Sequence, residues 1–169
     1  MKTTKTIRPL LLTAFFLLII LIPARAQENA SGANQLGLRL GPYSGFTFRH
    51  WGASNLGYEI SLVGWAPYRG AILSGLAEKN VPLHNGFALY FGGGIFLSSY
   101  DYGPYRYKID GVWYVERRGI PYFGIEGVLG ADYYIPNAPV VLSLDLRPRF
   151  FNVVYPYLWD AGLNVRYEF

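Results

Sequence analysis

Apolar and polar residues alternate with a period of two along most of the chain after residue 34. The alternation is clearest near the C-terminus, where Leu163, Val165 and Tyr167 share one set of positions and Asn164 and Arg166 share the other. Successive side chains of a β-strand point to opposite faces, so this period is typical of strands with one apolar face. It predicts eight strands, at 35–41, 46–51, 56–65, 71–78, 87–98, 122–135, 140–148 and 158–169.

Strands of this kind close into a barrel in one of two ways. A soluble, lipocalin-like periplasmic binding barrel turns its apolar face inward, whereas an outer-membrane barrel turns it outward to lipid. The second is favoured because the apolar faces are wide and aliphatic and the polar faces carry glycines and charges of both signs. We therefore predict an all-β protein, an eight-stranded antiparallel transmembrane β-barrel over residues 35–169, with the soluble barrel as the alternative.

Aromatic residues near the predicted strand ends support the same choice, because outer-membrane barrels carry aromatic girdles at both membrane interfaces. The residues assigned to these girdles are Trp51, Trp65, Tyr133, Tyr134, Phe150, Phe151, Tyr157 and Trp159.

Clusters of Gly, Pro, Asn and Asp mark the connections between the strands. Periplasmic turns are expected at 52–55, 79–86 and 136–139, and external loops at 42–45, 67–70, 100–121 and 149–157. The segment 41–45 is also compatible with a bulge inside one long strand. The long loop contains Asp110-Gly111, which favours a tight hairpin turn, so its flanks are expected to form a ribbon that protrudes from the membrane.

The first 26 residues have the pattern of a cleaved secretory signal peptide. Cations at Lys2, Lys5 and Arg8 precede the apolar run 10–22, and Ala24-Arg25-Ala26 is a typical cleavage site. The run has 13 residues, and a spanning helix needs about 20. Cleavage after Ala26 leaves a short lead-in, 27–34, before the barrel.

Composition narrows the possible functions. Of the 15 basic residues, four lie within the first 26 and no acidic residue does, so the exported chain carries 11 of each sign. A neutral chain gives no reason to expect a nucleic-acid partner. The absence of cysteine excludes disulfides, thiol catalysis and a lipid anchor on an N-terminal cysteine.

The polar faces turn charged residues of both signs toward the barrel interior. Unpaired charges are costly at low dielectric, so opposite charges are expected to pair there. An eight-stranded barrel has room inside only for side chains or one small ligand. The first hypothesis is a largely closed interior filled by ion pairs, and the second is a narrow ion channel. The residues expected in this network are Arg39, Arg49, Glu59, Glu78, Glu126, Asp132, Asp145, Arg147, Arg166 and Glu168.

The predicted ribbon combines aromatic and basic residues that suit contacts at the cell surface. Exposed strand edges recruit partner strands, and guanidinium groups bind phosphate. Lipopolysaccharide, or an unknown surface partner bound through 100–121, is therefore expected there; an ordinary amphipathic hairpin is the alternative. The expected contact residues are Tyr105, Arg106, Tyr107, Trp113, Tyr114, Arg117 and Arg118.

Support for catalysis is thin. A lipid A-modifying barrel enzyme is an alternative, but the histidines, His50 and His84, are placed at the periplasmic end, away from the outer leaflet. No residues have the spacing of a metal site, so no catalytic residue, metal or cofactor is expected. Gly92-Gly93-Gly94 lies within a strand with no following helix, and indicates close packing rather than a phosphate loop.

Several stretches resemble small eight-stranded bacterial outer-membrane proteins of the OmpA/OmpX-like, Bacteroidetes type. They are 37–41, 89–94, 135–139, 142–148 and 165–169. Leu163, Val165, Tyr167 and the terminal Phe169 are similar to the assembly signal that the barrel-insertion machinery reads in such proteins. The family is mostly of unassigned function, so the resemblance implies location in a Gram-negative outer membrane, among lipid and lipopolysaccharide, and no catalytic residues. A structural or surface-interaction role is the resulting expectation.

Overall fold

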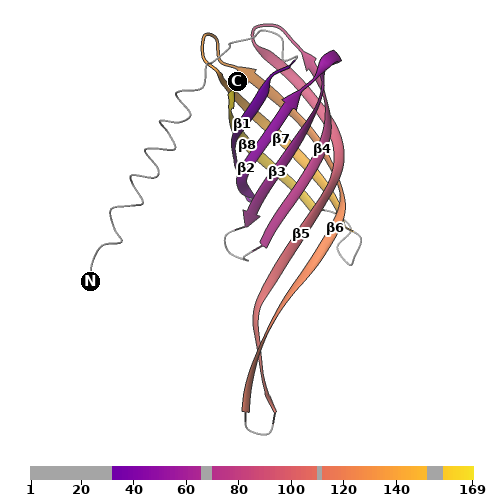
Figure 1. Cartoon of the computed structure of the whole chain (residues 1–169), viewed down its shortest axis with the longest axis vertical. Coiled ribbons are helices and arrows are strands. Elements are labelled where there is room, and N and C mark those ends of the chain that lie inside the picture. Colours follow the sequence, from indigo (N-terminus) through magenta and orange to yellow (C-terminus); the bar gives the residue numbers. More distant parts are fainter. Residues whose placement is uncertain (1–31, 66–69, 110–111, 152–157) are drawn as a thin grey trace, which may run out of the picture.

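The computed structural model describes residues 32–65, 70–109, 112–151 and 158–169, apart from some side chains within the strands. They form one closed barrel of eight strands, each antiparallel to its neighbours in the chain, with the last strand paired to the first (Figure 1). The strands are β1 (Asn34–Leu40), β2 (Ser44–Trp51), β3 (Leu56–Trp65), β4 (Gly70–Pro82), β5 (Phe87–Ile109), β6 (Val112–Tyr134), β7 (Val140–Phe151) and β8 (Leu158–Glu168). The predicted fold class and strand order are confirmed.

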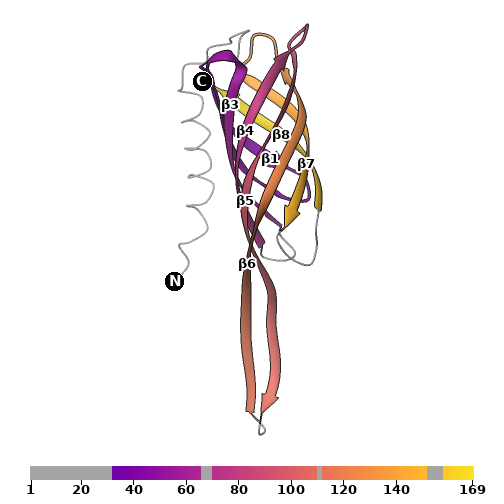
Figure 2. The ribbon, with the colours of Figure 1, turned by 90° about the vertical axis from the view of Figure 1, so that its right-hand side faces the viewer.

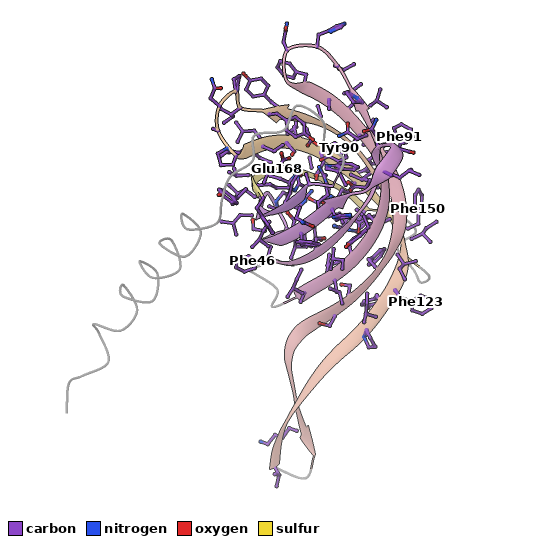
Figure 3. The ribbon with its side chains drawn as sticks, turned by 45° about the horizontal axis from the view of Figure 1, so that its top comes forward. Phe46, Tyr90, Phe91, Phe123, Phe150 and Glu168 are labelled. Carbon is purple, nitrogen blue, oxygen red and sulfur yellow. The ribbon has the colours of Figure 1, made fainter. Side chains whose placement is uncertain are left out.

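The barrel turns its apolar faces outward and its polar faces inward. Ile95 is 70% exposed and Leu144 64%, whereas the charged side chains on the alternate positions are buried. Figure 3 shows Phe46, Phe91, Phe123 and Phe150 on the outside of the barrel. This is the reverse of a soluble barrel, so the lipocalin-like alternative is wrong.

The barrel closes where its first and last strands meet. Gln35 pairs with Glu168 and Leu40 with Leu163 across β1 and β8. The main chains of Asn34 and Phe169 exchange two hydrogen bonds, of 3.1 and 2.8 Å. The terminal residue therefore completes the β1–β8 seam.

The two ends of the barrel differ. One end, the turn end, carries the C-terminus and three short connections: the β2–β3 turn with the 3-10 helix η1 (Ala53–Asn55), and the β4–β5 and β6–β7 turns. At the other end, the ribbon end, β5 and β6 continue far beyond their neighbours as a twisted two-stranded ribbon (Figure 2). Pairing of β5 with β4 ends at Ser99 and pairing of β6 with β7 begins at Gly124, so the predicted protruding ribbon is present. In the described residues, no helix is long and apolar enough to cross a membrane.

One predicted connection is confirmed and two change. The segment 41–43 is the expected turn between β1 and β2 and not a bulge. β4 continues to Pro82, which shortens the predicted turn 79–86, because Asn80 and Val81 extend the alternation of buried and exposed positions. β7 continues to Phe151, so Arg149 lies in a strand and not in an external loop.

Pro148 explains why sequence reasoning ended β7 too early. Proline has no main-chain N–H for a sheet ladder. The β6–β7 pairing indeed skips from Arg149 to Leu146, but Pro148 still pairs with Trp159 on β8. The strand therefore runs through the proline with an interruption on one side only.

Two of the predicted girdle aromatics face inward instead. Trp51 is completely buried, and Tyr134 is partly buried against the cluster that contains it. Trp51 lies two residues after Arg49 and Tyr134 two residues after Asp132, so both occupy inward positions. Their assignment to the girdles rested on their position near strand ends. Phe150 and Trp159 are exposed, and Tyr133 packs against Phe87 with ring centroids 4.7 Å apart.

Some predictions fall outside the described residues. These are the signal peptide and its cleavage site, residues 67–69 and 152–157 of two expected external loops, with Tyr157, and the turn at Asp110-Gly111. The side chains of Trp65 and Phe151 also lie outside the described residues, as do those of the expected contact residues Tyr105, Arg106, Tyr107, Trp113, Tyr114, Arg117 and Arg118.

Candidate functional site in the barrel interior

The interior contains a network of guanidinium and carboxylate groups. All ten residues expected there from the sequence have side chains that are at most 4% exposed. They reach the interior because each occupies an alternate, inward position of its strand. Figure 3 shows Glu168 and Tyr90 within the barrel and the labelled phenylalanines outside it.

Glu59 on β3 lies at the centre of the network. One of its oxygens accepts a 2.7 Å hydrogen bond from Arg147, and the other accepts one of 2.7 Å from Arg166. Arg49 lies 3.1 Å from the second oxygen. Three guanidinium groups from β2, β7 and β8 therefore converge on one carboxylate.

Arg49 extends the network toward the turn end. Its guanidinium lies 2.9 Å from Glu78 and 3.0 Å from Asp132. The same group stacks on two aromatic rings, 4.1 Å from the centroid of Tyr90 and 5.1 Å from that of Trp51. Such cation–π contacts strengthen when they are removed from water.

Asp145 extends the network toward the ribbon end. It pairs with Arg39 at 2.7 Å and with Arg147 at 2.8 Å, and it accepts a 2.9 Å hydrogen bond from Asn164. Arg39 also lies 3.1 Å from Asp160, so β1, β7 and β8 are linked through these groups.

Two members of the network were missed by sequence reasoning. Arg149 pairs at 3.0 Å with both Glu126 and Asp160, and all three side chains are buried. Asp160 has the same parity as Asn164 and Arg166 on β8, a signal that was available in the sequence. Arg149 has the parity of Arg147, but the intervening proline concealed it.

Apolar clusters lie on either side of the charges. Toward the turn end, Trp51, Leu76, Tyr90 and Val128 pack together. Leu76 and Glu78 both face inward, so the inner face of β4 carries an apolar and a charged side chain next to each other. At the ribbon end, Tyr43, Val63, Ile72 and Phe96 form a second buried cluster with Leu158 against it.

Inward glycines give the large side chains their space. A Cβ atom at Gly162 would overlap the guanidinium of Arg39, and one at Gly130 would overlap the ring of Tyr90. Gly92 and Gly94 lie on inward positions so close to the backbone of β4 that a Cβ would overlap it, whereas Gly93 faces outward. The triple glycine is thus a site of close packing within a strand.

Both histidines lie at the turn end of the barrel. His50 is on the outer face near the turn end, with Nδ1 2.9 Å from Asn34 Oδ1 and its ring 5.3 Å from that of Tyr58. His84 lies in the β4–β5 turn. Among the described residues, no group of three or more His, Cys, Asp or Glu side chains is arranged to hold a metal ion.

The residues of the expected assembly signal lie on the outer face of β8. Leu163 is 45% exposed, Val165 39% and Phe169 36%, and the rings of Tyr167 and Phe169 stack with centroids 6.4 Å apart. They form one continuous apolar strip that ends at the β1–β8 seam.

The expected surface-contact residues all belong to the ribbon. A register shift between Asp101 and Pro104 is followed by regular pairing from Pro104–Arg117 to Ile109–Val112. This register puts positions 105, 107 and 114, all tyrosine, on one face of the ribbon. It puts positions 106, 108, 113 and 117, which are arginine, lysine, tryptophan and arginine in the sequence, on the other face.

Solved structures with the same architecture are known. The N-terminal β-barrel domain of OprF from Pseudomonas aeruginosa matches with a TM-score of 0.66 at 14% identity, over 83% of this chain and 100% of that domain. The fold is that of a small outer-membrane barrel. Neisserial surface protein A (NspA) also matches, with a TM-score of 0.52 at 14% identity, over 81% of this chain and 94% of its own. No protein-family model matches the chain, and the search of curated proteins found no similar sequence.

Proposed function

We propose that this chain is an integral outer-membrane barrel with a closed, charged interior, and that it displays the β5–β6 ribbon at the cell surface. The observation that carries the proposal is the inverted distribution of side chains, with aliphatic residues outside and ion pairs inside. Water cannot satisfy an apolar exterior, but lipid can, and a closed barrel leaves no strand edge unpaired in the hydrocarbon layer.

The orientation follows from the connections. Outer-membrane barrels have short turns toward the periplasm and longer connections outside. The turn end, which carries the C-terminus, is then periplasmic, and the ribbon is extracellular. The same arrangement exposes the strip of Leu163, Val165, Tyr167 and Phe169 for the barrel-assembly machinery during insertion.

The closed interior supports a structural role rather than transport. The ion pairs connect Glu78, near the turn end, to Asp160, near the ribbon end, through Arg49, Glu59, Arg147, Asp145 and Arg39. Buried apolar side chains fill the ribbon end beyond them. A water-filled path needs space that these side chains occupy. No catalytic role is proposed.

Conductance in planar lipid bilayers tests the closed interior. The purified mature chain is expected to show no unit conductance. Steady unit conductance, altered in size or ion selectivity by Asp145→Ala or Arg166→Ala, would establish a narrow channel instead. Conductance that these variants leave unchanged would indicate a contaminating porin, which a preparation lacking this chain controls for.

The ribbon is the element proposed to make contacts. Both of its edges lack a neighbouring strand among the described residues beyond Ser99 and before Gly124. Such edges accept a partner strand, and the face with Arg106, Lys108 and Arg117 suits phosphate groups. We assign this face to the phosphates of lipopolysaccharide.

Binding of immobilised lipopolysaccharide to the barrel in phosphatidylcholine nanodiscs tests this assignment. The triple variant R106Q/K108Q/R117Q is expected to bind at least about tenfold more weakly, since charge-assisted hydrogen bonds are lost. Glu116→Gln, on the opposite face, is the matched control and should bind normally. Equal binding by the triple variant, or equal binding to dephosphorylated lipopolysaccharide, would overturn the assignment.

A further inference from the structure

The turn end of the barrel contains a cavity that the proposed function does not use. It has a volume of about 540 Å³ and lies between the β4–β5 turn and the β6–β7 turn. Its walls are largely apolar and include Leu83, Phe87, Ile135 and Val141. Cavities of this size accept small organic groups.

Two buried hydrogen-bond acceptors lie in the cavity wall, the amide oxygen of Asn80 and the carboxylate of Glu168. Asn80 and Glu168 line it, and their side chains are 2% and 4% exposed. The amide nitrogen of Asn80 lies 3.4 Å from the hydroxyl of Tyr134, while its Oδ1 accepts no hydrogen bond from the described residues. Gln35 donates to Glu168 at 2.8 Å, which holds that carboxylate in position. A buried acceptor without a donor is costly, so a ligand that donates hydrogen bonds is favoured here.

Charge favours a cation. The described interior contains seven buried carboxylates and five buried guanidinium groups, a formal excess of two negative charges. The carboxylates are Glu59, Glu78, Glu126, Asp132, Asp145, Asp160 and Glu168. Glu168 is the one that lines the cavity. The residues of the two turns line the cavity at the turn end, and at the opposite end the interior is filled by the Tyr43–Val63–Ile72–Phe96 cluster.

We propose that this cavity binds a primary ammonium group carried on a short apolar stem. The ammonium donates to Asn80 Oδ1 and the Glu168 carboxylate, and the stem packs against Phe87, Ile135 and Val141. Either a free amine or a lysine side chain of a periplasmic peptide supplies this chemistry. The proposal stands on the cavity alone, so its failure would leave the closed interior and the ribbon unaffected.

Titration calorimetry tests the proposal on the mature chain in phosphatidylcholine nanodiscs. The probes are n-pentylammonium, n-pentanol as the uncharged equivalent, and acetyl-Leu-Lys-Leu-amide with its Nζ-acetylated form as control. Empty nanodiscs correct for partition into lipid. Saturable binding of the charged probes and not of the uncharged ones is expected. If pentylammonium binds, a free amine suffices; if only the lysine peptide binds, the ligand is a partner segment.

Two substitutions at one position separate recognition from folding. Asn80→Leu removes the acceptor and is expected to weaken binding at least about tenfold, as is Glu168→Gln. Asn80→Asp keeps nearly the same side-chain shape but adds a negative charge, and it is expected to tighten binding of the ammonium group. A folding defect would weaken binding in all three variants. Failure of both charged probes to bind, equal binding of the uncharged probes, or no response to these substitutions would overturn the proposal.

Discussion

At the scale of single residues, a few charged side chains in the interior each form ion pairs with several others. Glu59 is such a position, because Arg49, Arg147 and Arg166 all converge on it. Removing one member of a buried ion-pair group leaves the others charged and without compensation. Glu59 therefore affects stability more than its single charge suggests.

We predict that Glu59→Gln lowers the free energy of unfolding by about 3–5 kcal/mol, because three buried guanidinium groups lose their common partner. Guanidinium chloride titration followed by tryptophan fluorescence measures the change. Ser61→Ala is the matched control on the same face of β3, because the Ser61 hydroxyl is buried and has no hydrogen-bond partner among the described residues. Equal effects of the two variants would contradict the central role of Glu59.

Glycine positions give a second prediction at this scale. Gly162→Val places a side chain where the Arg39 guanidinium lies and displaces it from Asp145 and Asp160. We expect a loss of stability of about 1–3 kcal/mol, as in other overpacked interiors. Gly75→Val is the control, since a Cβ there meets nothing within 4 Å. The same titration should show Gly75→Val unchanged or slightly more stable, and a comparable loss in both would count against this account.

At the scale of elements, alternation predicted the strands well and their ends less well. β3 has the predicted bounds, and the other strands begin or end elsewhere for identifiable reasons. β7 runs through Pro148, because a strand can continue when only one of its two ladders is interrupted. Side-chain parity identified most of the buried charges, but distances between strands far apart in sequence decide which of them pair. The contact of Arg39 with Asp160 is an example that no local pattern contains.

The last strand carries the prediction that belongs to this scale. Deleting Phe169 is expected to slow membrane insertion, because it removes the terminal aromatic of the β8 strip and the two main-chain hydrogen bonds to Asn34. The level of chain in the outer-membrane fraction, followed over time after induction, measures this. Phe150→Ala, which removes an exposed aromatic from β7, is the control. Normal insertion of the truncated chain would refute the assembly role.

At the scale of the whole molecule, the barrel is an inverted protein with two unlike ends. Its exterior is apolar and its interior charged, and every strand is paired to two neighbours along the barrel wall. This architecture could be predicted from the alternation of apolar and polar residues and from the short connections at one end. The turn-end cavity was not predictable, since turns far apart in the chain form its walls.

A closed wall of this kind predicts resistance to detergent. Unboiled chain in SDS is expected to migrate differently from boiled chain, because a barrel without free edges unfolds in SDS only when heated. Gel electrophoresis of the outer-membrane fraction measures the shift, and a boiled sample is its internal control. Recovery of the chain in the soluble periplasmic fraction without a shift would contradict membrane insertion.

The interior charges also link the last strand to the rest of the barrel. A sheet that contains β1 to β7 but not β8 lacks Asp160, the carboxylate that both Arg39 and Arg149 contact, and Arg166, which contacts Glu59. A sheet without β8 would leave Arg39 with Asp145, Arg149 with Glu126, and Glu59 with Arg49 and Arg147, so each group would have fewer partners than in the closed barrel. Gln35 and Glu168 meet at the β1–β8 seam but are 133 residues apart in the chain. Pairing of β8 with β1 therefore has a loop-closure entropy cost, and contacts so distant in sequence form slowly. Docking of β8 therefore closes the barrel wall and completes the interior ion-pair network in the same step.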